Sequence, residues 1–590
     1  MFHKEKNRIW QILFVLLCCM QMLTAVYFCC RKQGFHEDEY YTYYSTARTF
    51  GLNIEDNAWM EHDTYFNEFT VLRGEQFQYG LVKQVQSWDV HPPVYYWIFH
   101  TISSFFPERF SKWYGLSLNL AAYGLSMFLL WILCLKVTGD NEKLSLLICL
   151  FYGFTPAVMS SVVFIRMYAL LMVFVLLCAI LHIEALRGYD RGNNNDDGYP
   201  NMEPVKLPIG KFLFPLAIVT YFGFLTQYYY FIFLFFMAVA FCVFLLWMDR
   251  NLWNCIRYAV SLAIAFVLAY ITYPAFPGQM FKGQRGAQAT GNFFDLSNTL
   301  MRLEFFYQLL DEYVFGKMLS LLLIVIIVLL LYVNVKKRIS LLNKVNENVK
   351  SDLGDIADYE SKLNKQKGID TQIREGNLGI QYSSYFILLF TVLGYFFVVS
   401  KTALLLGETS IRYQIPVYGI IVLLIFTAID YLAKRCYKYS GLKLNKRKNG
   451  NLYNWVLAAA ALIAIAVNVS GFLTNRVVFL YPEDADRVAF AKEMAANKTL
   501  VVYIYDEAQS WCVWDVADEL FEYDRVYFAS QGSDDAITDS TIMESNEVVV
   551  YLNNSADSKA QLGRIMESSP GLSEYELMYS EKYCDVYYLH

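Results

Sequence analysis

The chain has 590 residues, of which 56% are hydrophobic and 17% aromatic, and only 18% are charged. Because about a quarter of the residues of soluble proteins carry a charge, this composition excludes an ordinary soluble globular protein. The net charge of −6 argues against a nucleic-acid partner, since proteins of that kind present a basic face to the phosphates.

Apolar stretches recur along the sequence, each with about the 20 residues needed to cross the hydrocarbon core of a bilayer. We predict about eleven transmembrane helices and therefore an α-helical polytopic membrane protein that is integral to the plasma membrane. The block 211–248 is either two spans or one long kinked element. The predicted spans cover 9–30, 114–135, 144–164, 166–187, 211–226, 228–248, 255–275, 317–334, 384–404, 413–433 and 454–474.

The charges between the spans predict their orientation, because Lys and Arg concentrate in cytoplasmic loops. The first apolar run follows Lys4, Lys6 and Arg8 and is interpreted as a retained span rather than a signal peptide, with the N-terminus in the cytoplasm. Segment 434–448 is basic and contains no acid, whereas 31–112 has more acids than bases. The first is therefore assigned to the cytoplasm and the second to the outside.

These assignments divide the chain into two domains. Residues 1–474 form the transmembrane domain, with an outer loop at 31–113 and a cytoplasmic insertion at 335–383. Residues 475–590 predict a small extracytoplasmic α/β domain, because short β-branched and aromatic runs alternate with helical patterns. Its strands are expected at 499–505, 525–529, 547–552, 574–579 and 585–589, and its helices near 510–522 and 559–568.

Three further patterns concern the loops and the cysteines. The helical run 39–50 is expected to lie on the membrane surface with its tyrosines at headgroup depth. The weak heptad pattern in 335–381 favours a helical hairpin or a surface helix over a coiled coil. Most of the 12 cysteines lie in apolar spans without metal-ligand spacing, which indicates packing residues.

Asp38 and Glu39 follow the first span directly, at the start of a predicted helix. Adjacent residues do not share a helix face, so one carboxylate is expected to face a cavity while the other anchors the helix or binds a metal ion. A helix N-terminus favours the ionised carboxylate, which is the form that a general base requires. The alternative is an acidic helix terminus without a chemical role.

Two later motifs bring polar groups to the same outer side. His91-Pro92-Pro93 precedes the second span, and its prolines hold the chain extended and fix the direction of His91; an interfacial turn is the alternative. Arg166 lies in the otherwise apolar run 162–170, where a charge is costly unless it faces water or an anion. A snorkelling arginine at a turn is the alternative for this residue.

The remaining motifs also fall on outward turns. Tyr228 lies at one of them, and Arg412 and Tyr413 lie in a short outer loop. A guanidinium suits a phosphate because its fork makes paired hydrogen bonds. The alternatives are a salt bridge from Arg412 to Glu408 and simple interfacial anchoring of the tyrosines.

Together these motifs resemble the GT-C superfamily of polytopic glycosyltransferases, in the branch of the protein O-mannosyltransferases and aminoarabinose transferases. The resemblance covers about residues 1–474, and both the order and the membrane side of the motifs match. The family usually has His where this chain has Gln227. The motifs are Asp38-Glu39-Tyr40, His91-Pro92-Pro93-Val94-Tyr95-Tyr96, Arg166-Met167-Tyr168-Ala169-Leu170, Gln227-Tyr228-Tyr229 and Arg412-Tyr413-Gln414-Ile415-Pro416.

The resemblance implies an inverting glycosyl transfer at the outer membrane face. The donor would be a sugar on a polyprenyl phosphate that enters from the bilayer, and Asp38 would deprotonate the acceptor hydroxyl. Glu39 would orient the site or help to bind a divalent cation, for which His91 is a second candidate; no dedicated metal cage appears in the sequence. Arg412, with Arg166 or Arg285, would hold the phosphate, and the substrate pocket would include His91, Tyr168, Tyr228 and Tyr413.

Two other functions stay open on the sequence alone. A transporter or flippase of lipid-linked sugars would also place charges in the membrane domain, although no internal repeat is evident. A non-catalytic scaffold presenting residues 475–590 would have no need of Asp38, Arg166 and Arg412 on one side. The sequence names neither the sugar nor the acceptor, which could be a protein, a lipid or a cell-wall glycan.

Overall fold

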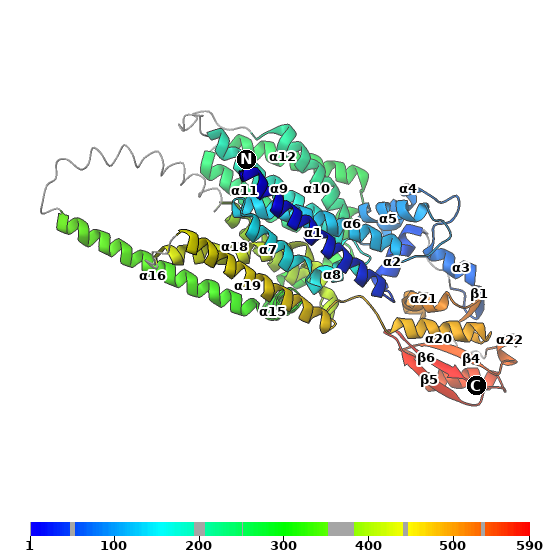
Figure 1. Cartoon of the computed structure of the whole chain (residues 1–590). Coiled ribbons are helices and arrows are strands. Elements are labelled where there is room, and N and C mark those ends of the chain that lie inside the picture. The colour runs from blue at the N-terminus through cyan, green and yellow to red at the C-terminus, as the bar shows by residue number, and fades with distance from the viewer. Residues whose placement is uncertain are drawn as a thin grey trace.

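The structure is a computed structural model that describes residues 2–47, 54–193, 207–249, 252–351, 383–439, 446–532 and 537–590. Figure 1 shows a long helical bundle with a small sheet-containing part at one end, where the C-terminus lies. This is the polytopic helical fold with a small C-terminal α/β part that the sequence predicts.

Within the described residues, ten helices are long and apolar enough to cross a membrane, or eleven when one bent pair counts as a span. The number and the positions agree with the prediction, and the block 211–248 is two helices that meet at Gln227–Tyr228. The spans are α1 (Phe2–Arg31), α6 (Trp113–Thr138), α9 (Tyr168–Asn193), α10 (Phe214–Thr226) with the π-helical turn η2 (Ile209–Leu213), α11 (Tyr229–Asp249), α12 (Leu252–Thr272), α16 (Leu319–Ser351), the helix Ser383–Thr402, α18 (Ile415–Tyr439) and α19 (Lys446–Leu473).

The bent pair consists of α7 (Glu142–Gly153) and α8 (Pro156–Val163), whose directions differ by 58°. The bend has a local cause. The Thr155 hydroxyl accepts a hydrogen bond from the Val158 N–H and caps α8, while a proline at the first turn has no N–H with which to continue α7. Because α8 ends at Val163, the helical backbone stops just before Arg166.

The helix α16 runs beyond its apolar part and ends at Ser351. The rest of the insertion 335–383, including the expected hairpin or surface helix, lies outside the described residues. The prediction for this segment is therefore untested.

The loop 31–113, which the prediction calls the first outer loop, folds into short elements around the end of α1. In α2 (Glu37–Ala47), Tyr40 and Tyr43 are buried, and the Tyr43 hydroxyl donates to the Ser111 carbonyl at 2.9 Å. These tyrosines therefore pack inside the protein and do not lie on its surface. The other elements of the loop are β1 (Ala58–Glu61), α3 (His62–Phe66), η1 (Asn67–Phe69), α4 (Tyr79–Trp88) and α5 (Val94–Ser104).

The connection between α12 and α16 is largely helical and is fixed to the bundle by two buried cations. Nε of Arg302 donates to the Ser400 carbonyl at 2.9 Å, and Nζ of Lys401 donates to the Thr299 hydroxyl at 2.9 Å. A short helical turn that carries Arg412 follows the helix Ser383–Thr402. The elements of this region are α13 (Phe276–Phe281), α14 (Gln284–Phe294), α15 (Thr299–Tyr313) and the turn η3 (Gly407–Tyr413).

The C-terminal part contains a mixed sheet with the strand order β1-β3-β2-β4-β6-β5. The central strands β3, β2 and β4 are parallel, whereas the edge strand β1 comes from the first outer loop and places Trp59 opposite Tyr527. The five C-terminal strands lie where the sequence predicts them. They are β2 (Leu500–Tyr505), β3 (Arg525–Ser530), β4 (Val548–Asn553), β5 (Tyr575–Ser580) and β6 (Cys584–Leu589), with helices α20 (Asp484–Ala496), η4 (Glu507–Val516), α21 (Ala517–Leu520), α22 (Ser540–Met543) and α23 (Ser558–Ser568).

This sheet-containing part rests on α2 through polar contacts. The Tyr40 hydroxyl donates to the Asp518 carboxylate at 2.6 Å, and Lys582 forms an ion pair with Glu37 at 2.6 Å. Together with β1, these contacts hold the start of α2 from the side opposite the bundle. The position of α2 is what fixes the residues described next.

Candidate active site

Asp38 stands in the first turn of α2, close to the end of α1. Its backbone N–H donates to Nδ1 of His36 at 3.1 Å, so this ring nitrogen is unprotonated. The Asp38 side chain is 27% exposed, whereas that of Glu39 is fully buried. The two carboxylates therefore lie in different environments, as their adjacent positions on a helix predict.

Two buried arginines from distant parts of the chain converge on Asp38. Nη1 of Arg412 lies 2.7 Å from its Oδ2 atom, and Nη2 of Arg166 lies 3.7 Å from its Oδ1 atom. Nη1 of Arg166 also donates to the Asp38 carbonyl at 3.0 Å and to the Tyr96 hydroxyl at 2.9 Å. Three sequence motifs thus meet at one carboxylate.

Some donors of these guanidinium groups have no acceptor within the described residues. Nε of Arg166 and both Nε and Nη1 of Arg412 make no hydrogen bond there, although each side chain is only 4% exposed. The contact of Arg412 with Asp38 is accordingly an ion pair outside hydrogen-bond geometry. Because buried donors without acceptors are costly, the arrangement is suited to receive an anion.

Burial and charge set the protonation of the site. Burial disfavours the ionised form of Asp38, but Arg412 and Arg166 outweigh this effect and hold the pKa of the carboxyl well below its usual range. Burial lowers the pKa of both His36 and His91 to about 4. At neutral pH the site therefore contains an ionised carboxylate, two guanidinium cations and two neutral imidazoles.

Glu39 serves as an anchor between separate parts of the fold. Its Oε2 atom accepts from Lys32 Nζ at 2.9 Å and from the His36 N–H at 2.7 Å, and its Oε1 atom accepts from the Ile165 N–H at 2.6 Å. Lys32 also donates to the Phe479 carbonyl at 2.8 Å. This fully buried ion pair joins the end of α1, the start of α2 and the backbone beside Arg166.

Aromatic rings form the walls around the charged centre. The His91 ring stacks at 6.5 Å on Tyr96, the residue whose hydroxyl accepts from Arg166. On another side, the Tyr168 and Tyr413 rings meet edge to face at 5.9 Å, and Tyr229 meets Tyr413 at 5.7 Å. Of the sequence-predicted site residues, His91, Tyr168 and Tyr413 thus lie around the Asp38 centre with both arginines.

Tyr228 belongs to a neighbouring polar cluster. Its hydroxyl donates to Oε1 of Gln279, whose Nε2 donates to the backbone carbonyls of Gln86 and Asp89 at 2.7 and 2.6 Å. The Tyr273 hydroxyl accepts from the same amide and donates to the His91 carbonyl. Tyr228 therefore contacts the support of the His91 loop and not the Asp38 carboxylate.

Arg285 is not brought to this centre by any contact found in the described residues. It lies exposed on α14, and the ion-pair partners of Asp38 there are Arg166, Arg412 and His36. The 3.6 Å contact between Asp38 and His36 is not a charged pair at neutral pH, because the imidazole is neutral.

Sequence reasoning missed Lys32, Gln279 and Asp89. The negative charge of Asp89 interacts favourably with the cationic forms of both Arg166 and His91. Its position two residues before His91-Pro92-Pro93 could have drawn attention to it. Lys32 gave a weaker signal as a cation at the end of a span. Gln279 gave none, because its role depends on hydrogen bonds to backbone carbonyls far away in sequence.

Glu39, one of the two sequence candidates for a divalent cation, fits that role poorly. Both carboxylate oxygens of Glu39 already accept short hydrogen bonds, one of them from an ammonium group. In the part of the chain that the structure describes, no three His, Cys, Asp or Glu side chains are grouped to hold a metal ion. Glu39 fits the anchoring role that its position on α2 also allows.

The architecture is that of a polytopic helical membrane protein with a small C-terminal sheet, and it carries an ionised carboxylate between two arginines at one end of the bundle. Two solved structures of ArnT from Cupriavidus metallidurans match nearly the whole chain. The one bound to undecaprenyl phosphate has a TM-score of 0.50 and 12% identity, with 98% of each chain covered. The apo structure has a TM-score of 0.50 and 11% identity, with 99% of this chain and 98% of ArnT covered. Neither the models of protein families nor the curated protein sequences contain a match.

Proposed function

We propose that this protein transfers a sugar from a polyprenyl-phosphate donor to an acceptor hydroxyl, with inversion and with Asp38 as the base. The observation that carries the proposal is the ionised Asp38 carboxylate between Arg166 and Arg412, both buried and both with unused donors. A base and an anion site side by side suit a reaction whose leaving group is a phosphate.

The two arginines are proposed to hold the donor phosphate. A guanidinium offers paired donors to a phosphate, and Nε of each arginine is unused within the described residues. Support also comes from one of the two ArnT structures, in which ArnT is bound to undecaprenyl phosphate. Arg285, which is exposed on α14, is proposed to contact the phosphate only when substrate is bound.

Donor binding would also activate the base. A carboxylate held by Arg412 is a weak base, because efficient general bases have a pKa near the working pH. A phosphate that takes over the donors of Arg412 removes part of the charge that stabilises ionised Asp38, so the pKa of Asp38 rises. The acceptor hydroxyl is then deprotonated only when the donor is in place.

In the transfer step, the acceptor oxygen forms a bond to the anomeric carbon while the bond from that carbon to the phosphate oxygen breaks. The hydroxyl proton goes to Asp38, and the polyprenyl phosphate leaves with the bonding electron pair. Arg412 and Arg166 stabilise the negative charge that develops on the leaving phosphate. Glu39 acts as the anchor of α2 and does not contact substrate.

The remaining proposed roles concern recognition and topology. His91, Tyr168 and Tyr413 shape the sugar pocket, and Tyr228 supports it through the His91 loop. Asp38 faces the outside of the plasma membrane, the N-terminus lies in the cytoplasm and the C-terminal part is extracytoplasmic. Residues 475–590 contact the helix that carries Asp38, which supports the proposal that they meet the acceptor.

The test is turnover by the purified full-length protein in lipid, offered a panel of radiolabelled polyprenyl-phosphate sugars with a membrane extract as acceptor. Wild-type turnover is expected to be lost in Asp38→Asn and Arg412→Ala and kept in the exposed controls Asp63→Asn and Arg73→Ala. Equal turnover in wild type and Asp38→Asn would remove Asp38 from the mechanism. Saturable lipid binding without turnover of any donor would favour a transporter.

A further inference from the structure

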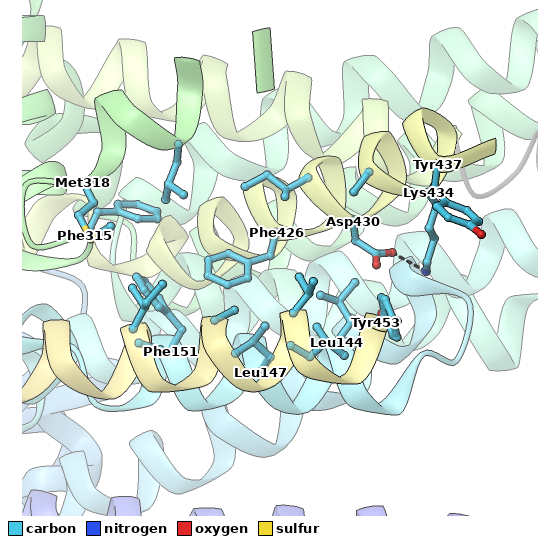
Figure 2. Close-up of a pocket in the computed structure, with 18 residues that line it drawn as sticks. Leu144, Leu147, Phe151, Phe315, Met318, Phe426, Asp430, Lys434, Tyr437 and Tyr453 are labelled. Carbon is cyan, nitrogen blue, oxygen red and sulfur yellow. Dashed lines mark hydrogen bonds and ion pairs between the residues drawn. The ribbon is translucent and has the colours of Figure 1, made fainter. Parts of the chain in front are cut away.

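Two hollows flank α19 in the bundle. The first has a volume of about 560 Å³ and lies between α7, α16, α18 and α19, as Figure 2 shows. The second has a volume of about 420 Å³ and lies between α1, α7 and α19. Leu147 and Leu457 line both hollows, so the two spaces lie on opposite sides of the contact between α7 and α19.

The polar residues of both hollows gather at the same end. In Figure 2, Lys434 and Tyr453 lie together at one end of the first hollow and Phe315 lies at the other. The polar lining of the second hollow is Lys143 and Asn454. Since Tyr453 and Asn454 are neighbours at the start of the apolar part of α19, each hollow is a largely apolar space with a lysine at this end, beside Asp430 in the first hollow.

The contacts at this end keep the two lysines on either side of α19. Lys434 lies 5.1 Å from the centre of the Tyr453 ring and pairs with Asp430 at 2.6 Å, and its side chain is 54% exposed. Lys143 donates to Asn454 Oδ1. This end lies far from Asp38, because α18 and α19 cross the bundle between them: Arg412 precedes α18, and α19 leads to the C-terminal part (Figure 1).

We propose that this is a binding site for an anionic diacyl phospholipid, with its phosphate between Lys143 and Lys434 and one acyl chain in each hollow. Basic groups between transmembrane helices at a membrane surface bind anionic headgroups, and the volumes lie in the range of ligand pockets, about 300–1,000 Å³. Lys434, Arg435 and Lys438 near the end of α18 are all basic, which favours an anionic over a zwitterionic lipid. The lipid belongs to the leaflet opposite the Asp38 centre.

The site is distinct from the proposed donor site. A donor with its phosphate at Arg412 would enter from the other leaflet, and the end of the first hollow away from Lys434 is lined by Phe315 and Met318. That end offers no cation among its lining residues. The polar end at Lys434 therefore assigns the headgroup to the leaflet away from Asp38.

The test measures lipid binding directly, so it does not depend on the proposed transferase activity. The purified full-length protein in neutral detergent is titrated with phosphatidylglycerol or with phosphatidylcholine of the same chains, and bound lipid is counted by native mass spectrometry. Phosphatidylglycerol is expected to bind more tightly. Lys143→Gln and Lys434→Gln are each expected to weaken it about 5-fold, while Lys434→Arg and the exposed control Lys337→Gln keep wild-type binding.

Substitutions on α19 test the position of the chains. Ala460→Phe fills the first hollow and Ala458→Phe the second, and both are expected to reduce lipid binding. Ala459→Phe is the matched control, because this exposed residue lines neither hollow. Equal binding of the two lipids, equal losses in Lys337→Gln, or displacement of phosphatidylglycerol by polyprenyl phosphate that is abolished in Arg412→Ala would each overturn the proposal.

Discussion

Oδ2 of Asp38 lies 2.7 Å from Nη1 of Arg412, which joins the first turn of α2 to the turn that precedes α18. The Phe164 ring lies against the same guanidinium at 5.3 Å. Asp38 is thus the counter-ion of a buried arginine, and any phosphate that binds Arg412 competes with it. The strength of the carboxylate as a base depends on this exchange.

The first prediction concerns the pH dependence of catalysis. The profile of kcat/KM reports the free enzyme and that of kcat the enzyme with substrate bound. Because the bound phosphate shares Arg412, the pKa of Asp38 is higher in the complex, and activity falls as pH drops through it. We expect the acid limb of kcat to lie at higher pH than that of kcat/KM, as measured by steady-state turnover. If the acid limbs of kcat and kcat/KM lay at the same pH, the proposed transfer of Arg412 from Asp38 to the phosphate would be contradicted.

The second prediction concerns the paired N–H donors of the Arg412 guanidinium. Arg412→Lys keeps the positive charge but loses the paired donors, so we expect a loss in kcat of about 10²–10³, the usual effect of removing one charge-stabilising donor. Stability is expected to change little, because the ammonium still pairs with Asp38. Arg73→Lys, at an exposed position, is the control. A loss confined to KM would indicate that this arginine only binds the donor.

The third prediction concerns the buried pair of Lys32 and Glu39. Glu39→Gln leaves the ammonium without a counter-ion, so we expect a loss of about 3–5 kcal/mol in the free energy of unfolding. The double variant Lys32→Met/Glu39→Gln removes both charges and is expected to recover much of this loss. Urea denaturation in detergent measures both. Additive losses in the double variant would show that the two charges do not depend on each other.

The fourth prediction concerns the two neutral imidazoles. The pKa values of His36 and His91 are lowered from 6.5 to about 4, so the unfolded chain binds protons before the folded protein does. The free energy of unfolding is therefore expected to fall as pH drops from about 6.5 to about 4 and to level off below. His36→Gln is expected to remove part of this dependence, and the control His62→Gln to leave it unchanged. The measurement is the free energy of unfolding over this pH range, and an equal pH dependence in wild type and His36→Gln would contradict the prediction for His36.

The fifth prediction concerns Gln279, which supports the His91 loop through two backbone carbonyls. Gln279→Leu removes the side-chain donor from both carbonyls; the Gln86 carbonyl still accepts from the Asp89 N–H at 3.1 Å, whereas the Asp89 carbonyl loses its donor at a cost of about 1–3 kcal/mol when it is buried. We expect lower donor affinity with a smaller change in kcat, because in the proposed mechanism the loop shapes the sugar pocket and does not carry the base. Tyr228→Phe is expected to have a weaker effect of the same kind, and the exposed control Gln284→Leu to have none.

Much of the fold was predictable from the sequence, because the bilayer imposes a length and an apolar composition that each span must meet alone. The five C-terminal strands followed from local alternation. The strand β1 could not be predicted in the same way, since it joins a sheet built from residues more distant in the chain. The bend between α7 and α8 could have been suspected from Thr155-Pro156.

The sequence by itself determined which side chains needed an explanation. Arg166 lies in an apolar run and Arg412 in a short loop, where a charge is costly, and Asp38 is marked by its place at the start of a helix just beyond the first span. Only the tertiary structure decided their partners: that Arg412 and Arg166 meet Asp38, that Glu39 turns away to Lys32, and that Gln279 carries the His91 loop. These contacts depend on how segments far apart in the chain come together, which local composition and periodicity do not encode.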